Sequence, residues 1–145
     1  MKNYHIGYFV KRISNNFENI KRKNCEEYDI TAQQTSILMY LSHFKDTDIN
    51  QKAIEKYFEL SNATVSGLIS RMETKGLVKR VANPLDKRDK HIVLTDKGSE
   101  TIGSIKKSIN NLEQSVIKGF SEEEIKDLLS FFERMLANIK EETND

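Results

Sequence analysis

The chain has 145 residues, a length that suits one compact domain with a real core and is too short for two independent ones. A hydrophobic fraction of 37%, a charged fraction of 31% and a single proline are typical of a globular, helix-rich protein. No run approaches the roughly 18 consecutive apolar residues that cross a bilayer, and the N-terminus lacks an apolar signal region. We therefore expect a cytoplasmic protein without a membrane partner.

Charge is unevenly distributed, although the formal net charge is only +1. Residues 71–97 contain eight basic and four acidic side chains, whereas residues 121–145 contain three basic and eight acidic ones. The basic middle segment is therefore a candidate for contact with nucleic acid, which the net charge alone does not indicate.

Apolar residues at helical spacing predict four helices in the first half of the chain. Steps of three and four between these residues place them on one stripe of each helix. The expected helices cover about residues 2–25, 32–43, 51–58 and 62–75. Their expected N-caps accept hydrogen bonds from free backbone N–H groups, and these are Thr31 (in a capping box with Gln34), Asn50 and Ser61. Gly76 supplies a left-handed residue after the fourth helix.

The pattern after Gly76 changes from helical to extended spacing. Two short apolar runs, residues 77–81 and 91–94, flank a polar tip at residues 83–90. The tip combines turn formers with exposed charge, so a β-hairpin is the simplest interpretation.

Two further helices are expected toward the C-terminus. Thr95 caps the first, which runs to about Val116, and Ser121 with Glu124 forms a capping box that opens the second. Together with the N-terminal helix, they carry apolar stripes larger than one small domain can cover. We therefore expect a homodimer with the contact residues Ile6, Val10, Ile13, Ile105, Ile109, Leu112, Leu128, Phe132, Met135 and Ile139. A monomeric bundle that packs the stripes on itself is the alternative.

Two short helices joined by a tight turn and followed by a charged hairpin describe a winged helix-turn-helix, which binds double-stranded DNA. The outer face of helix 62–75 carries small or hydrogen-bonding side chains apart from Arg71, a composition that suits a major groove. Arg88 at the hairpin tip would enter the neighbouring minor groove. The candidate DNA-binding residues are Asn62, Ala63, Thr64, Ser66, Gly67, Ser70, Arg71, Lys87, Arg88 and Lys90.

Two alternatives stay open at this surface. In the first, the helix face and the hairpin are solvated surfaces that bind nothing. In the second, the winged helix contacts a protein instead of DNA. Asp86 and Asp89 fit each interpretation, because a carboxylate beside Arg88 either orients its guanidinium or merely neutralises it.

This part of the sequence resembles the MarR family of transcriptional regulators. The segments that carry the resemblance are Asn50–Glu55, Ser61–Ile69, Arg71–Arg80, Asp86–Lys90 and Val93–Gly98. The resemblance implies a dimer that reads a palindromic operator, and repression relieved by a small molecule or another signal. Two residues depart from the family pattern. Glu59 replaces a common glycine in the turn, which must form without positive φ or with modest strain, and Gly67 replaces a larger polar residue.

The expected fold class is mainly α with a small β-wing. We expect residues 1–145 to form a single MarR-like domain. Residues 31–95 would form its winged helix-turn-helix, and residues 1–28 and 96–142 would form flanking dimerisation helices. Tyr8, Tyr40 and Phe44 are candidates to line an effector cavity in the dimer, with ordinary core packing as the alternative.

Catalytic and metal chemistry are not expected. The sequence shows no nucleophile with a base and no phosphate-binding glycine loop, so we expect neither an enzyme nor a cofactor. His5, His43 and His91 are too scattered for a metal motif. The family's zinc-responsive branch uses histidines on the long dimer helix, and residues 96–118 contain none.

Cys25 is the single cysteine and cannot form an intrachain disulfide. Neighbouring basic residues increase thiolate character, which leaves a peroxide-sensor interpretation open. The family's oxidant sensors keep their cysteine nearer the start of the first helix. We therefore expect an inert thiol.

Overall fold

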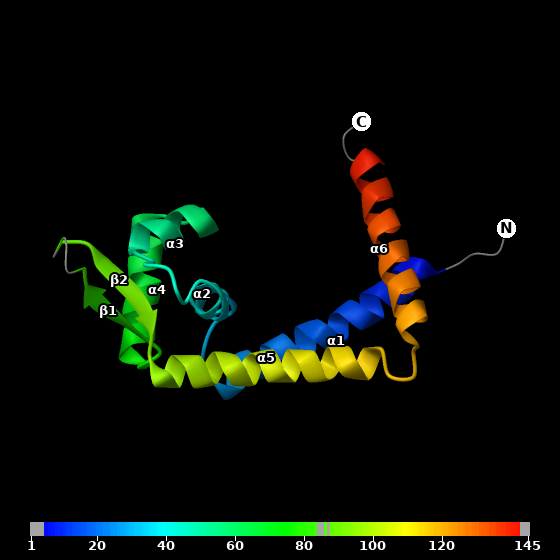
Figure 1. Ribbon diagram of the computed structural model, residues 1–145, viewed down its shortest axis with the longest axis horizontal. Coiled ribbons are helices and arrows are strands. Elements are labelled where there is room, and N and C mark those ends of the chain that lie inside the picture. Colours follow the sequence, from blue (N-terminus) through cyan, green and yellow to red (C-terminus); the bar gives the residue numbers. More distant parts are fainter. Residues whose placement is uncertain (1–4, 84–85, 87, 143–145) are drawn as a thin grey trace. The chain divides into compact units, whose positions relative to one another are not determined.

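The computed structural model describes residues 5–83, 86 and 88–142, with side chains through Lys140. Within this range it contains six helices and one two-stranded sheet, which confirms the predicted mainly α class with a small β-wing (Figure 1). In chain order the elements are α1 (Ile6–Glu27), α2 (Ala32–His43), α3 (Gln51–Phe58), α4 (Asn62–Thr74), β1 (Val78–Ala82), β2 (Lys90–Leu94), α5 (Asp96–Val116) and α6 (Glu122–Glu142). The chain divides into two compact units, Met1–Ile109 and Asn110–Asp145.

Side-chain caps begin α2, α3 and α4 where the sequence predicts them. The hydroxyl of Thr31 accepts a hydrogen bond from the backbone N–H of Gln34 at 3.2 Å, and the Gln34 side chain accepts from the N–H of Thr31 at 3.0 Å. Asn50 and Ser61 cap the next two helices through their side-chain oxygens. Each cap satisfies a backbone donor that has no partner inside its helix, so the helix boundaries are set locally.

The turn between α3 and α4 forms with a left-handed residue. Glu59 has φ 52° and ψ 40°, and the following N–H, that of Leu60, donates to the carbonyl of Glu55 at 3.0 Å. A non-glycine residue in this conformation costs roughly 1–2 kcal/mol. Of the two possibilities for this turn, the structure therefore has the strained one. Gly76, with φ 69°, takes the predicted left-handed position after α4 without that cost.

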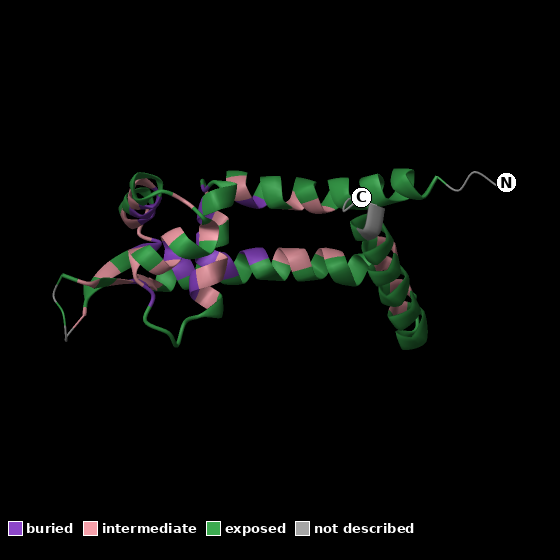
Figure 2. Cartoon of the chain, turned by 90° about the horizontal axis from the view of Figure 1, so that it is seen from above, coloured by how far each residue is buried: buried purple, intermediate pink, exposed green. Residues whose placement is uncertain are grey.

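The core of the first unit lies where α2, α3 and α4 meet the hairpin and the first turns of α5 (Figure 2). The apolar stripe predicted for α4 is fully buried, and it consists of Val65, Leu68, Ile69 and Met72. Ile102 and Ile105 of α5 lie in the same core. Because Ile105 is only 1% exposed, its side chain is already covered by its own chain. This placement corrects the prediction that Ile105 contacts a second copy.

The wing is an antiparallel hairpin, as predicted. Its register pairs Val78 with Leu94 at the base and Ala82 with Lys90 near the tip. The segment before α3 joins its edge, because the N–H of Ile92 donates to the carbonyl of Ile49 at 2.7 Å. A two-stranded hairpin is marginally stable by itself, so this third partner fixes the wing to the helical part.

α1 packs on the middle of α5 through a polar contact. The buried side chain of Asn24 donates to the hydroxyl of Ser108 at 2.9 Å, and that hydroxyl lies 3.1 Å from the Asn24 carbonyl oxygen. Asn24 is the only buried residue among those described in α1, so the rest of this helix is largely exposed in one chain (Figure 2). α1 ends at Glu27, two residues beyond the predicted end.

The second unit holds α6, which opens with the predicted capping box. The N–H of Glu124 donates to the hydroxyl of Ser121 at 3.2 Å, and the N–H of Ser121 donates to the Glu124 carboxylate at 2.7 Å. The hydrogen bonds from Ser121 hold the pKa of Glu124 below its ordinary value. α6 has no fully buried residue among those described. Throughout the described ranges, no helix is long and apolar enough to cross a membrane.

Candidate nucleic-acid interface

The outer face of α4 is open to solvent and is built largely of small or polar side chains. The buried stripe on the opposite side fixes the rotation of the helix. Ser66 and Gly67 are half-buried, whereas the exposed members of the predicted set are Asn62, Ala63, Thr64, Ser70 and Arg71. Six of these seven side chains are small or uncharged, and such a face can approach base edges closely.

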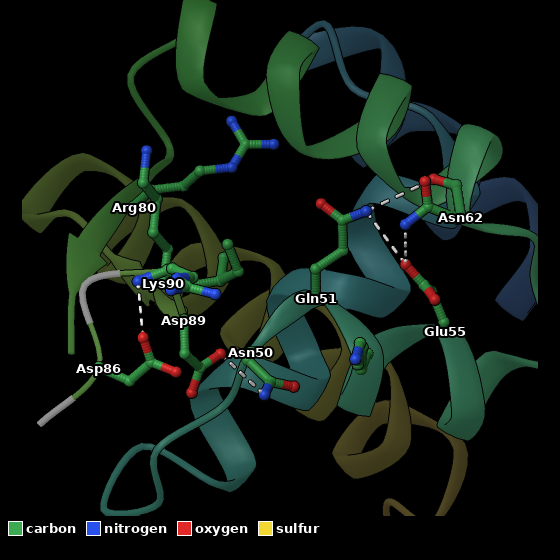
Figure 3. Close-up of a pocket in the computed structure, with 11 residues that line it drawn as sticks. Asn50, Gln51, Glu55, Asn62, Arg80, Asp86, Asp89 and Lys90 are labelled. Carbon is green, nitrogen blue, oxygen red and sulfur yellow. Dashed lines mark hydrogen bonds between the residues drawn. The ribbon is translucent and has the colours of Figure 1, made fainter.

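The first turn of α4 is tied to α3 through Glu55. Its carboxylate accepts hydrogen bonds from the Asn62 side chain at 2.8 Å and from the Gln51 side chain at 3.0 Å (Figure 3). The two amides are thereby held in fixed orientations next to the helix start. Asn62 was predicted from its position, but Gln51 and Glu55 were missed. Their spacing of four residues on α3 is typical of any solvated helix face.

A cleft of about 600 Å³ separates these helix starts from the wing (Figure 3). Four basic side chains line it, namely Lys52 from α3, Arg80 from β1, and Arg88 and Lys90 from the hairpin. Sequence analysis predicted the last two and missed the first two, which lie outside the hairpin tip. Lys87, also predicted, lies outside the described residues. Three acidic residues, Glu55, Asp86 and Asp89, line the same cleft, so the basic side chains exceed the acidic ones by one, a small excess that favours an anionic partner.

The four basic residues differ in how they are engaged. The backbone N–H of Arg80 donates to the Glu73 carboxylate at 3.2 Å, and its guanidinium forms an ion pair with the same carboxylate. Arg88 and Lys90 are exposed, and among the described residues no carboxylate pairs with the Arg88 guanidinium. Arg80 thus ties β1 to α4, while Arg88 is available to a partner.

The two aspartates of the wing accept hydrogen bonds, Asp86 from the wing backbone and Asp89 from two asparagine side chains. Asp86 accepts a hydrogen bond from the backbone N–H of Arg88 at 3.0 Å. Asp89 accepts from the side chains of Asn50 at 3.1 Å and Asn83 at 3.3 Å. These bonds, with that of Asn83 the stronger influence, hold the pKa of Asp89 below its ordinary value. Within the described part of the wing, neither carboxylate orients or neutralises the Arg88 guanidinium.

Curated proteins similar to this chain in sequence are HTH-type transcriptional regulators. The MarR family profile matches residues 28–89. The regulator MgrA of Staphylococcus aureus is 33% identical over 105 residues, which cover 71% of this chain and 67% of MgrA. The chain belongs to the MarR family.

Three more comparisons extend the likeness over most of this MarR-family chain. The HTH-type transcriptional regulator BilQ of Clostridioides difficile (strain CD3) is 29% identical over 124 residues, covering 86% of this chain and 82% of BilQ. The S. aureus MepR–DNA complex has a TM-score of 0.84 and 28% identity, covering 92% of this chain and 98% of MepR. MepR bound to ethidium bromide has a TM-score of 0.83 and 27% identity, covering 96% of this chain and 99% of MepR.

A second cavity of the MarR-family chain, about 630 Å³ in volume, lies between α1, α2, α3 and α5. Tyr40 and Phe44, both predicted, line it together with Tyr57 and Phe58, which were missed. The rings form one cluster, in which the centroid of Tyr40 lies 4.3 Å from that of Tyr57 and 5.0 Å from that of Phe44. The ring planes are inclined by 39° between Tyr40 and Tyr57 and by 56° between Tyr40 and Phe44, so the wall is aromatic but not flat.

Tyr8 does not line this cavity. The α1 residues that line it begin at Glu18, ten residues later, which is about 15 Å along a helix. Tyr8 is 55% exposed, and its ring contacts Phe9 and the Arg12 guanidinium instead. Tyr8 is therefore not part of this cavity within one chain, and its place in an effector cavity of the dimer stays a prediction.

The predicted dimer residues divide between α1, α5 and α6. Ile6, Val10 and Ile13 are more than two-fifths exposed on α1, and Ile139 is 57% exposed on α6. The half-buried members are Ile109, Leu112, Leu128, Phe132 and Met135. Apart from Ile105, these side chains are therefore at least partly exposed in one chain.

Cys25 lines the second cavity, and its sulfur lies 3.8 Å from the hydroxyl of Thr35. It is half-buried, and the described residues contain no other cysteine. No group of three or more His, Cys, Asp or Glu side chains in the described ranges is placed to hold a metal ion. His91, which lies in β2 of the wing, contacts the carboxylates of Asp48 and Asp89.

Proposed function

We propose that this chain is a sequence-specific transcriptional repressor that binds a palindromic operator as a homodimer and releases it when a small molecule binds. The single observation that carries the proposal is the exposed, small and polar face of α4 beside a cleft lined by four basic side chains. We place the protein in the cytoplasm, where its DNA partner lies. The named relatives MgrA and BilQ are transcriptional regulators, and we propose no enzymatic activity for this chain.

In the proposed complex α4 enters the major groove and the hairpin follows the backbone to the minor groove. Thr64, Ser70 and Arg71 are exposed on the groove-facing side of α4 and can exchange hydrogen bonds with base edges. Lys52 and Arg88 approach phosphates from the two sides of the cleft. The similarity to the MepR–DNA complex supports this assignment.

The proposed dimer is formed by α1, α5 and α6. Large apolar side chains are exposed on α1 and α6, among them Phe9, Ile13, Leu136 and Ile139. Burying one such side chain contributes roughly 1.5–3 kcal/mol, so several together favour a stable interface. We accordingly assign residues 31–95 to DNA binding and residues 1–28 and 96–142 to dimerisation.

The proposed effector site is the aromatic cavity. Its walls come from α1 and α5 on one side and from α2 and α3 on the other. A ligand between them would alter how the start of the DNA-binding part is held against the helices assigned to the dimer. A planar, largely apolar molecule fits the ring cluster, and the ethidium-bound form of MepR supports this class.

Selection of genomic DNA fragments with the purified full-length protein tests the proposal. Sequencing of retained fragments is expected to yield one inverted repeat, with half-sites about 10 bp apart for a two-fold dimer. Recovery without a shared motif would contradict sequence-specific binding. A wing that contacts protein instead of DNA would leave salt-dependent DNA affinity unchanged when Arg88 is replaced.

A cavity-filling variant tests the ligand response. Ser36 lines the cavity on α2, so Ser36→Trp should abolish stabilisation by planar aromatic compounds in thermal melts while operator affinity is retained. Gln33→Trp is the matched control, because Gln33 is exposed on the same helix and is not part of the lining. Equal ligand-induced shifts in both variants would place the ligand elsewhere.

A further inference from the structure

The wing is joined to α3 by one carboxylate. Asp89 accepts a hydrogen bond from the side chain of Asn50 at 3.1 Å (Figure 3). It also accepts one from the side chain of Asn83 at 3.3 Å. Asn50 precedes α3, whereas Asn83 and Asp89 lie on opposite sides of the hairpin tip. The backbone strengthens this closure, because the N–H of Asn83 donates to the carbonyl of Asp89 at 3.0 Å. A single side chain thus connects both sides of the tip to the helical part.

Asn50 uses both ends of its amide. Its oxygen caps α3 by accepting from the N–H of Ala53 at 3.0 Å, which leaves the NH₂ group free to point at Asp89. The amide orientation is therefore determined by the helix on one side and by the wing on the other. The sequence distance of 39 residues between Asn50 and Asp89 makes this a tertiary link.

The imidazole of His91, which belongs to β2, lies beside the carboxylate of Asp89. Its Nε2 lies 3.5 Å from the Asp89 carboxylate and its Nδ1 lies 3.3 Å from that of Asp48. The imidazole is only 13% exposed. The carboxylate of Asp89 consequently accepts hydrogen bonds from Asn50 and Asn83 and lies beside the His91 imidazole.

The charge of Asp89 has the wrong sign for direct contact with DNA. The side chain lines the cleft that also holds Lys52, Arg80, Arg88 and Lys90. A negative charge at that place repels phosphate, so electrostatics alone predicts that its removal strengthens DNA binding. An acidic group in this cleft calls for a role other than contact with phosphate.

We propose that Asp89 is a positioning residue for DNA binding, which holds the wing against the start of α3 so that Arg88 and Lys90 stand at a set place relative to α4. The inference rests on the proposed function in DNA binding. A wing fixed before binding loses less conformational freedom in the complex, so the link strengthens affinity although its charge opposes it.

Asp89→Ala separates positioning from charge. The variant should bind the selected operator about tenfold more weakly than wild type, the scale of a lost hydrogen bond to a charged group. Without DNA, the backbone amides of Asn83 and Asp89 should exchange hydrogen for deuterium faster than in wild type. Operator affinity equal to or above that of wild type would overturn the proposal.

Swapping the amide and the carboxylate between positions 50 and 89 provides a matched test that keeps the α3 cap. Asn50→Asp retains a capping oxygen but sets two carboxylates against each other, so affinity should fall about tenfold. The double variant N50D/D89N restores a donor and an acceptor in reversed order and should return to within about threefold of wild type. N50D/D86N has the same net charge without the restored bond and should stay as weak as Asn50→Asp. Equal affinities of the two double variants would overturn the proposal.

Failure of the proposed function has a different signature. In that case wild type binds no duplex at all. Its wing amides are still protected from hydrogen–deuterium exchange, and they lose that protection in Asp89→Ala. Circular dichroism melts of every variant show whether it is folded. If Asp89→Ala does not fold, the comparison between the two double variants decides.

Discussion

Gly98 of α5 lies directly against the backbone of Leu77 at the start of β1. A Cβ added at Gly98 would stand 2.0 Å from the carbonyl oxygen of Leu77, a distance that requires the backbone to move. The same carbonyl accepts from the N–H of Thr95 at 3.1 Å, and the Thr95 hydroxyl donates to the Gly76 carbonyl at 2.6 Å. The long helix therefore begins in close contact with the wing, and only glycine fits there.

Gly98→Ala should destabilise the protein by roughly 1–3 kcal/mol, the usual cost of overpacking. Urea unfolding at equilibrium measures this effect. Gly103→Ala is the control in the same helix, because nothing lies within 4 Å of a Cβ added there. It should stabilise the helix by about 0.5–1 kcal/mol through helix propensity. Equal stability of the two variants would show that the contact with Leu77 relaxes at no cost.

The proposed dimer predicts a particle of about twice the 16.8 kDa chain mass in sedimentation at micromolar concentration. Phe132→Glu should dissociate it, since a charge in an apolar interface cannot be solvated. Ser130→Glu adds the same charge at an exposed position of α6 and should leave the dimer intact. A wild-type protein that sediments as a single chain rules out the dimer.

Cys25→Ser should retain DNA binding and the response to ligand. Among the described residues the polar neighbour of the Cys25 thiol is the Thr35 hydroxyl at 3.8 Å, and serine has nearly the same shape. Operator binding after peroxide treatment is the measurement. Loss of binding in wild type but not in Cys25→Ser would identify Cys25 as a redox sensor.

Arg88→Ala should weaken binding to operator and unrelated duplex alike. The exposed guanidinium is expected to meet phosphate or the minor groove, so its loss lowers the salt slope by about one counterion. Arg12→Ala removes an exposed charge from α1, distant in sequence from the wing, and is the control. An Arg88→Ala protein with wild-type affinity and slope would identify the hairpin as a solvated loop.

The sequence predicted what depends on near neighbours. Thr31 with Gln34 and Ser121 with Glu124 form caps from residues three positions apart, and Gly76 ends α4 by its own backbone freedom. Such interactions need no knowledge of the rest of the chain. All helices described after α1 consequently begin within one residue of their expected caps.

Contacts between distant segments were not predictable in the same way. An apolar stripe must be covered, but the pattern does not say by what, and so Ile105 was assigned to a partner although its own core covers it. The link from Asn50 to Asp89 spans 39 residues and has no periodic signal. Lys52 and Arg80 likewise reach the cleft only through the packing of α3 and β1.

The most direct test of sequence-specific binding is a titration of the full-length protein with its selected operator and with a shuffled duplex, each at several salt concentrations. Wild type should prefer the operator by about a thousandfold or more, and both affinities should fall linearly on logarithmic axes as salt rises. Replacement of Thr64 and Ser70 on α4 should reduce that preference while the salt slope is kept. Equal affinity for the two duplexes at every salt concentration would contradict the proposed operator recognition.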